Sequence, residues 1–163
     1  MPAIDSEVIQ FENALRAFVQ TVKRPQQWAY VTNAAGVQLD RPAAVILQTL
    51  ILHQPKQLGV QDLALHLGIE PPSVTRKTQQ LEQAGYLRRI RDTQDRRAIS
   101  LEVTKAGHEV ADRLWKAQRS SMSQVLAGWS STDRQQLVSL FERFANELGT
   151  TAQPHEHTIK KGT

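Results

Sequence analysis

Two short helical segments joined by a very tight turn are the feature that most limits how this chain can fold. The first, Leu58–Gly68, has the spacing of an amphipathic helix and a glycine that can end it, and its predicted inward residues are Leu63, Ala64 and Leu67. Only Ile69 and Glu70 separate it from a second helix, which starts at Pro71 and stops at Gly85. The predicted inward stripe of this second helix is Val74, Thr78 and Leu81. Two helices so closely linked predict a helix-turn-helix.

A segment with strand-like alternation follows immediately. Tyr86–Arg91 and Ala98–Thr104 flank the polar stretch Asp92–Arg97, and a period of two indicates a β-hairpin with a charged loop. The residues expected to form its half-buried face are Leu87, Ile99, Leu101 and Val103. A hairpin directly after a helix-turn-helix predicts a winged helix.

Long helices are predicted on both sides of this unit. Asp5–Val22 has an apolar stripe with spacings of three and four, formed by Val8, Phe11, Leu15, Phe18 and Val22. Pro25 should end or kink that helix, Gln26–Ala35 should continue it, and Gly36 should close it. Asp40 is a good N-cap for a further helix that carries Val45, Ile46, Leu47, Leu50 and Ile51.

The C-terminal part should hold two more helices. The first has an irregular apolar stripe of Val110, Leu114, Ala117, Met122, Val125 and Trp129. Thr132 and Gln135 predict a capping box for the last helix, which bears Leu137, Leu140, Phe141, Phe144 and Leu148. The tail 150–163 lacks apolar periodicity and is expected to be disordered.

The predicted fold class is mainly α (α+β), with one domain over residues 1–149. Its winged helix-turn-helix covers about 40–104, and helices over about 5–36 and 105–149 form a dimerisation region. A second copy of the chain is the simplest cover for the apolar stripes of these helices. The alternative is that they fold back on their own winged unit.

The positive charge is concentrated in one stretch. The net charge is +4, and residues 71–105 contain eight Lys or Arg against four Asp or Glu, whereas the remainder is balanced. Such focusing is typical of elements that bind a polyanion, although a solvated surface with uneven charge gives the same count. The chain has no cysteine, which excludes disulfides and thiolate chemistry. Without a recognisable signal peptide or membrane span, a cytoplasmic protein is expected.

In this order, the motifs resemble those of the MarR family of bacterial transcriptional regulators. The resemblance covers roughly residues 6–148 and rests on Leu63–Gly68, on Pro72–Arg76 with Leu81–Leu87, and on Asp95–Ala98 with Leu101–Thr104 and Ala106–Gly107. It implies a homodimeric repressor that binds an inverted repeat in double-stranded DNA and is released by a small lipophilic or phenolic effector.

The helix from Pro71 is the predicted recognition helix. With its stripe turned inward, its outer side should carry Ser73, Lys77 and Gln80, flanked by Thr75, Arg76 and Gln79. Arg76 is the candidate for a bidentate contact with guanine, Gln79 or Gln80 could read adenine, and Lys77 should contact phosphate. In the wing, Arg96 and Arg97 are candidates for the minor groove, with Arg97 favoured by the resemblance, although either could pair with Asp95. Weaker DNA-binding candidates are Pro72, Arg88, Arg89 and Arg91, and for the three arginines a solvated strand face is an equal alternative.

Other sites are less well indicated. The resemblance places an effector near the junction of the dimer helices and the DNA-binding lobe, where the candidates are Phe18, Trp28, Tyr30, His53, Trp115 and Arg119. Ordinary packing is the competing interpretation for each of them. No metal site, cofactor or catalytic residue is predicted, because the histidines have no helical pair spacing and no known catalytic motif occurs. The competing functional classes are a winged-helix protein-interaction module and, least favoured, an enzyme.

Overall fold

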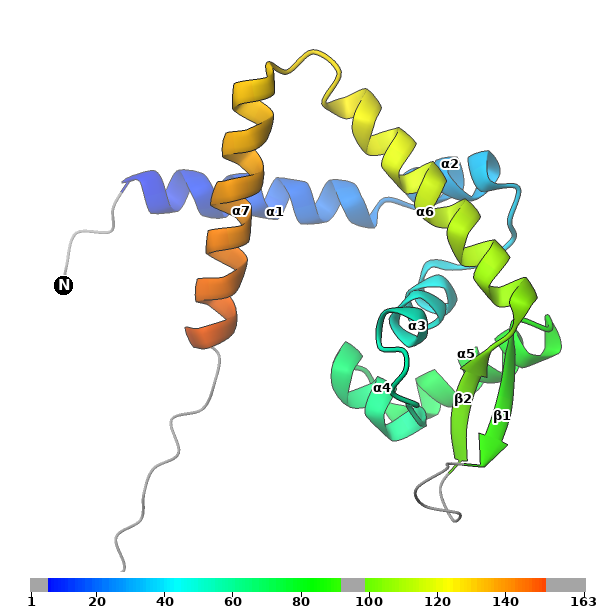
Figure 1. Ribbon diagram of the computed structural model, residues 1–163. Helices are drawn as coiled ribbons and strands as arrows, with labels where there is room; N and C mark the ends of the chain where they lie inside the picture. Colours follow the sequence, from blue (N-terminus) through cyan, green and yellow to red (C-terminus); the bar gives the residue numbers. More distant parts are fainter. Residues whose placement is uncertain (1–5, 92–98, 152–163) are drawn as a thin grey trace, which may run out of the picture. The chain divides into compact units, whose positions relative to one another are not determined.

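The structure is a computed structural model that describes residues 6–91 and 99–151 and divides the chain into two compact units, Met1–Ser121 and Met122–Thr163. The described residues form seven helices and one antiparallel hairpin, in the order given in Figure 1. The helices are α1 (Ser6–Lys23), α2 (Pro25–Ala35), α3 (Arg41–Leu52), α4 (Val60–Leu67), α5 (Pro71–Gln83), α6 (Lys105–Val125) and α7 (Ser131–Thr151), and the strands are β1 (Leu87–Arg91) and β2 (Ile99–Val103). The predicted winged helix is confirmed.

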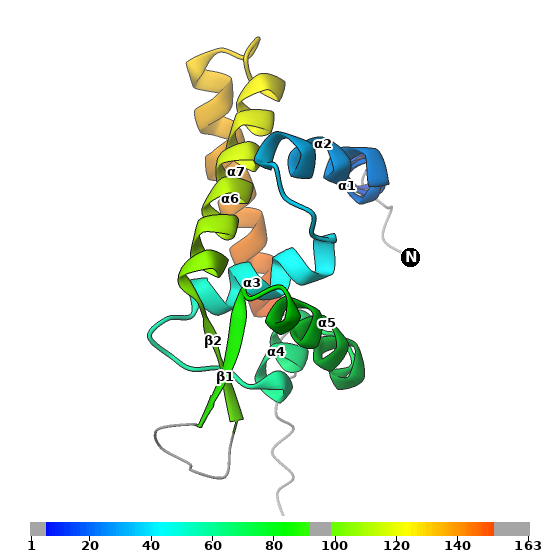
Figure 2. The same ribbon diagram turned by 90° about the vertical axis from the view of Figure 1, so that its right-hand side faces the viewer.

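The core of the winged unit lies where α3, α4 and α5 meet the hairpin and the first half of α6. In Figure 2, α4 and α5 run side by side next to the two strands. The largest fully buried apolar side chains are Ile46, Leu47, Leu58, Leu63, Val74, Leu81 and Leu114. Apolar residues from every element of the predicted helix-turn-helix therefore share one core.

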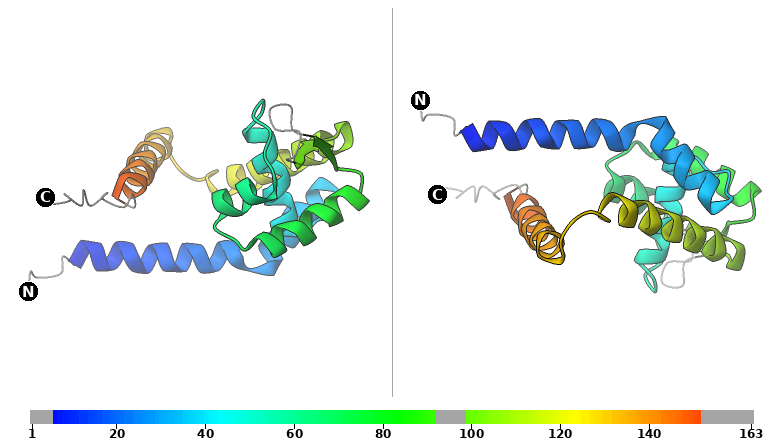
Figure 3. Two further views of the ribbon diagram at one scale, coloured as in Figure 1. Left: turned by 90° about the horizontal axis from the view of Figure 1, so that it is seen from below. Right: turned by 90° about the horizontal axis from the view of Figure 1, so that it is seen from above.

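Helix ends follow the chemistry that the sequence predicted. The Asp40 Oδ1 accepts a hydrogen bond from the Ala43 N–H at 2.9 Å and caps α3. Gly36 and Gly68 end α2 and α4 with a φ of 61° in both cases, a conformation that costs other residues more than glycine. Arg24 separates α1 from α2, and Pro25 occupies the first turn of α2, so the two helices meet at an angle (Figure 3).

The hairpin differs from the prediction in which residues it buries. Its register pairs Leu87 with Val103 and Arg91 with Ile99, and Leu58 adds an antiparallel bridge to Leu101 that the sequence did not indicate. Leu87, Leu101 and Val103 are buried as expected, but Ile99 is 56% exposed because it sits in the last described pair, farthest from the helices. Ser100 is buried instead, so β2 is covered on both faces at this level.

The terminal helices bury little apolar surface within one chain. No residue of α1 is buried, and in α6 the buried stripe of Val110, Ala111, Leu114 and Ala117 does not continue to Met122 and Val125. The capping box predicted for α7 at Thr132 and Gln135 is wrong: Ser130 caps the helix, and its Oγ accepts from the Asp133 N–H at 3.1 Å. Within the described residues, no helix is both long and apolar enough to cross a membrane.

A close approach at Gly107 joins the hairpin to α6. The Tyr86 carbonyl accepts from the Thr104 N–H at 3.0 Å, and the Thr104 hydroxyl accepts from the Gly107 N–H at 3.1 Å. A Cβ on Gly107 would lie 2.3 Å from the Tyr86 carbonyl oxygen and 2.8 Å from the Val103 Cγ1. Only glycine fits here without moving the backbone.

We therefore expect Gly107→Ala to lower the free energy of unfolding by about 1–3 kcal/mol, as overpacking of a core does. The loss should occur although alanine is the better helix former by up to about 1 kcal/mol. Gly149→Ala is the matched control, because Gly149 is also helical and its Cβ would meet nothing within 4 Å. Urea unfolding of the full chain measures both, and equal stabilities of the two variants would contradict the packing argument.

Candidate nucleic-acid interface

The orientation of α5 is set by its buried side. Val74, Thr78 and Leu81 are each 0% exposed, as the sequence predicted, and they face the core from three successive turns. Pro71 and Pro72 occupy the first turn, where proline has no intrahelical hydrogen bond to lose. Glu70 stands at the N-cap position but its side chain makes no capping hydrogen bond. The side of α5 opposite the core is therefore fixed by packing.

The predicted DNA-contacting residues of α5 differ in their exposure. Pro72, Arg76, Gln79 and Gln80 are exposed, whereas Ser73, Thr75 and Lys77 are half-buried. The Thr75 hydroxyl donates to the Pro71 carbonyl within the helix at 3.0 Å. Arg76 makes no hydrogen bond or ion pair with any residue that the structure describes. Its guanidinium is thus available on the outer side of the helix.

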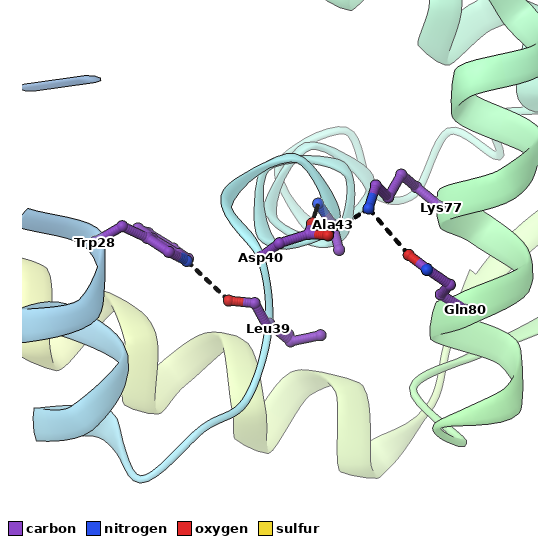
Figure 4. A network of polar contacts seen from close by, with 6 residues as sticks. All are labelled: Trp28, Leu39, Asp40, Ala43, Lys77 and Gln80. Atoms are coloured by element: carbon purple, nitrogen blue, oxygen red, sulfur yellow. Dashed lines mark hydrogen bonds and ion pairs between the residues drawn. The ribbon is translucent and has the colours of Figure 1, made fainter. Parts of the chain in front are cut away.

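Lys77 does not project into solvent as the sequence led us to expect. Its ammonium group forms an ion pair with the Asp40 Oδ2 and donates to the Gln80 Oε1 at 3.1 Å, and its side chain is only 16% exposed (Figure 4). Lys77 and Gln80 are three positions apart on α5, so their side chains are neighbours on the surface of the helix. Lys77 therefore ties the recognition helix to the start of α3.

The Asp40 carboxylate has two partners at once. Its Oδ1 caps α3 while its Oδ2 accepts from Lys77. Partial burial disfavours the charged form, but the Lys77 hydrogen bond, the Ala43 N–H and the charges of Lys77 and Arg76 outweigh this, so the pKa of Asp40 is lowered. The adjacent Leu39 carbonyl accepts from the Trp28 Nε1–H at 2.8 Å (Figure 4). Hydrogen bonds thus link α2, the start of α3 and α5.

Ion pairs also hold two of the three β1 arginines. Arg88 pairs with Glu102, its cross-strand neighbour, and Arg88 lowers the pKa of that carboxyl group. The Arg89 Nε donates to both carboxylate oxygens of Glu82 at 2.9 and 3.0 Å, which joins β1 to the last turn of α5. Arg91 is exposed and forms no ion pair with another described residue. Of the three predicted phosphate contacts, Arg88 and Arg89 are therefore held within the protein, and Arg91 has no such partner in the part of the chain that the structure describes.

The loop of the wing lies outside the described residues. This applies to Arg96 and Arg97, the two candidates for the minor groove, and to their possible partner Asp95. The described strands end at Arg91 and Ile99, directly before and after this loop.

The six candidate effector residues are not gathered in one place. Trp28 stacks under the Arg41 guanidinium at 5.3 Å, whereas the His53 ring contacts His66 at a centroid distance of 4.6 Å, at the opposite end of α3. Phe18, Tyr30 and Arg119 are exposed and Trp115 is half-buried. A cavity of about 410 Å³ between the turn after α3 and β2 is lined by other residues, among them Gln54, Gln57 and Leu101.

The fold brings together two histidines that their sequence spacing does not connect. His53 and His66 each place Nδ1 against the backbone carbonyl four residues earlier, at 2.8 and 3.0 Å. Over residues 6–91 and 99–151, no group of three or more His, Cys, Asp or Glu could hold a metal ion.

Sequence reasoning missed the structural roles of Asp40, Glu82 and Glu102. Asp40 was assigned only a capping role, and 37 positions separate it from Lys77. No linear pattern reports such a distant pair. The Arg88–Glu102 pair, by contrast, follows from the hairpin register, so strand alignment could have found it.

Comparison with known proteins matches this arrangement to one family. The model of the MarR family matches residues 39–99, from the start of α3 to the start of β2. The transcriptional repressor MprA of Escherichia coli is 26% identical over 107 residues, which are 66% of this chain and 61% of MprA, so the match spans about three fifths of that relative. The uncharacterised regulator YdgJ of Bacillus subtilis is 29% identical over 72% of this chain and 74% of its own length. A MarR family protein of Bacillus stearothermophilus has the same fold, with a TM-score of 0.73 and 19% identity over 91% of this chain and 98% of its own.

Two substitutions separate the roles of Asp40. Asn caps helices about as well as Asp, so Asp40→Asn should remove only the ion pair and cost less than about 1 kcal/mol at neutral pH. Asp40→Ala should cost about 0.5–2 kcal/mol more, because the cap is lost too. Thermal or urea unfolding of both variants measures these differences.

The pH dependence of the unfolding free energy tests the contribution of the Asp40–Lys77 ion pair. Because folding lowers the pKa of Asp40 from 3.8, its stabilisation is complete above that value and is lost as the pH falls through the folded-state pKa. The stability gap between wild type and Asp40→Asn should therefore close in acid. A gap that widened on acidification would contradict this assignment.

Proposed function

We propose that this winged-helix chain, whose residues 39–99 match the model of the MarR family, is a sequence-specific double-stranded DNA-binding protein that acts as a transcriptional repressor in the cytoplasm, and not as an enzyme. The observation that carries this proposal is that α5 has one buried side and one exposed polar side. Three of its residues are 0% exposed in the core, while Arg76, Gln79 and Gln80 are exposed together. An exposed polar side on a rigidly held helix suits the major groove of duplex DNA. MprA, a relative over 66% of this chain, is itself a transcriptional repressor.

Several residues of α5 have a chemical role in this proposal. The Arg76 guanidinium is free to donate to guanine O6 and N7 in a bidentate contact. Gln79 can read adenine, and the half-buried Ser73 and Thr75 hydroxyls lie in the first turns, where phosphates approach a helix N-terminus. Arg91, which has no ion pair among the described residues, supplies a charge from β1, and Arg96 and Arg97 are proposed to reach the minor groove.

A homodimer is the second part of the proposal. Apolar side chains of α1 and α7 are exposed in the single chain, including Phe18 at 53% and Phe141 at 56%. Exposed apolar stripes on long helices are costly in water and are relieved by self-association. A two-fold dimer would present two copies of α5 about one DNA turn apart, which matches an inverted-repeat operator.

Release by a small lipophilic or phenolic effector remains a proposal from the resemblance. Such a ligand must bind two arrangements of the protein with different affinities. Of the six candidates, Trp28 is linked to α5 through hydrogen bonds, because its indole N–H donates to the Leu39 carbonyl beside Asp40, which pairs with Lys77.

Arg76→Ala should weaken binding to a selected duplex by about 1–3 kcal/mol and flatten the preference at one base pair in each half-site. The reason is that the bidentate contact discriminates guanine from the other bases. Competition binding against random duplex measures both effects, and Lys116→Ala, which removes an exposed charge from α6, is the control. Equal losses on selected and random duplex would refute the base contact.

Phe141→Glu should dissociate the dimer, because it places a carboxylate on the apolar side of α7. We expect the dimerisation constant to weaken at least tenfold, which corresponds to about 1.4 kcal/mol, and affinity for an inverted repeat to fall with it. Sedimentation equilibrium measures the association state. Gln136→Glu adds the same charge at an exposed polar position of α7 and should leave the dimer intact.

A further inference from the structure

The side-chain amide of Gln80 forms a hydrogen bond with Lys77 of the same helix. Gln80 is exposed on α5, and its Oε1 accepts from the Lys77 ammonium at 3.1 Å. Because an ammonium group can only donate hydrogen bonds, the amide oxygen must be the atom that faces Lys77. The amide nitrogen, with its two hydrogens, is then the atom not engaged by Lys77.

Lys77 is in turn held in place by its own partner. Its side chain is 16% exposed and its ammonium pairs with Asp40, whose other carboxylate oxygen is bound by the Ala43 N–H at 2.9 Å. The chain Ala43–Asp40–Lys77–Gln80 therefore runs from the backbone of α3 to the outer side of α5 (Figure 4). A short, partly buried chain of this kind restricts the rotamers of its members.

This orientation changes which base Gln80 can read. A free glutamine reads adenine by accepting from N6 and donating to N7, which requires both amide atoms at the base edge. The Lys77 ammonium occupies one lone pair of the Gln80 oxygen, and its charge disfavours a second donor such as adenine N6 beside it, so Gln80 presents mainly its two N–H donors. Guanine presents two neighbouring acceptors, O6 and N7, in the major groove, whereas adenine presents only N7 there.

We propose that Lys77 is a positioning residue, not a phosphate contact, and that it fixes the Gln80 amide with its donors outward, so that Gln80 selects guanine over adenine. This inference rests on the proposed insertion of α5 into the major groove. It assigns a specificity-determining role to Gln80 and an indirect one to Lys77 and Asp40. Gln79, which is exposed and has no such contact among the described residues, keeps the ordinary adenine preference.

The experiment is selection of binding sites from a random duplex pool, performed with the full-length chain and its variants. Gln80→Ala identifies the base pair that Gln80 reads, because that position alone should lose its preference in each half-site. The wild type should prefer guanine there by about fivefold or more. Lys77→Met, which keeps the stem but removes the donors, should shift this position from guanine toward adenine and leave the others unchanged.

Two further variants test the positioning role. Lys77→Arg retains donors and charge and should keep the guanine preference, whereas Asp40→Asn retains the α3 cap, loosens Lys77 and should weaken that preference. If Lys77→Met does not fold, as judged by circular dichroism, Asp40→Asn and Lys77→Arg test the positioning role instead. Equal guanine preferences of these two variants at the Gln80 position would contradict it.

Different results would contradict the proposed DNA binding and the positioning role of Lys77. If the wild type selects no motif, the proposed function fails. If it selects a motif but Lys77→Met weakens all sequences equally and leaves the Gln80 position unchanged, Lys77 is a phosphate contact and the inference is overturned. An adenine preference of the wild type at the Gln80 position would overturn it as well.

Discussion

The burial of one side of α5 is the constraint on which the candidate interface depends. Val74, Thr78 and Leu81 are fully buried, and together they fix the rotation of the helix about its own axis. Since residues three and four apart share a helix face, this rotation decides that Arg76 is exposed and that Lys77 turns toward α3. A small rotation would exchange these roles, so packing in the core determines which side chains of α5 are available to the proposed DNA partner.

Much of the positive charge of the stretch 71–105 is already used within the protein. Lys77, Arg88 and Arg89 are paired with Asp40, Glu102 and Glu82. Exposed ion pairs contribute little to stability, typically about 0–1 kcal/mol, so they matter here for geometry. The Arg89–Glu82 pair joins the end of α5 to β1, and therefore links the recognition helix to the base of the wing. Charge counts from the sequence overstate the number of free cations.

Sequence patterns located the helices and strands because local chemistry determines their ends. Gly36 and Gly68 ended helices as expected, and Asp40 began one, since caps depend on neighbours within four residues. The burial predicted for Ile99 was wrong because alternation alone does not show that it lies in the last described pair, farthest from the helices. Periodicity also does not report the bridge between Leu58 and Leu101, which are far apart in sequence. The orientation of Lys77 escaped prediction for the same reason, because its partner Asp40 is distant in sequence.

In the proposed complex with DNA, the Asp40–Lys77 pair gives up one contribution to binding and provides another. A free lysine beside a phosphate adds affinity through counterion release, whatever the base sequence. A lysine already neutralised by Asp40 and shielded to 16% exposure gives up that general attraction, and it restricts the rotamers of Gln80 before DNA arrives. Ordering a side chain in advance lowers the entropic cost of each specific contact. A sequence-specific regulator, as we propose this chain to be, must choose one site among many competing sequences, and for that task a preorganised reading side chain is worth more than one additional nonspecific charge.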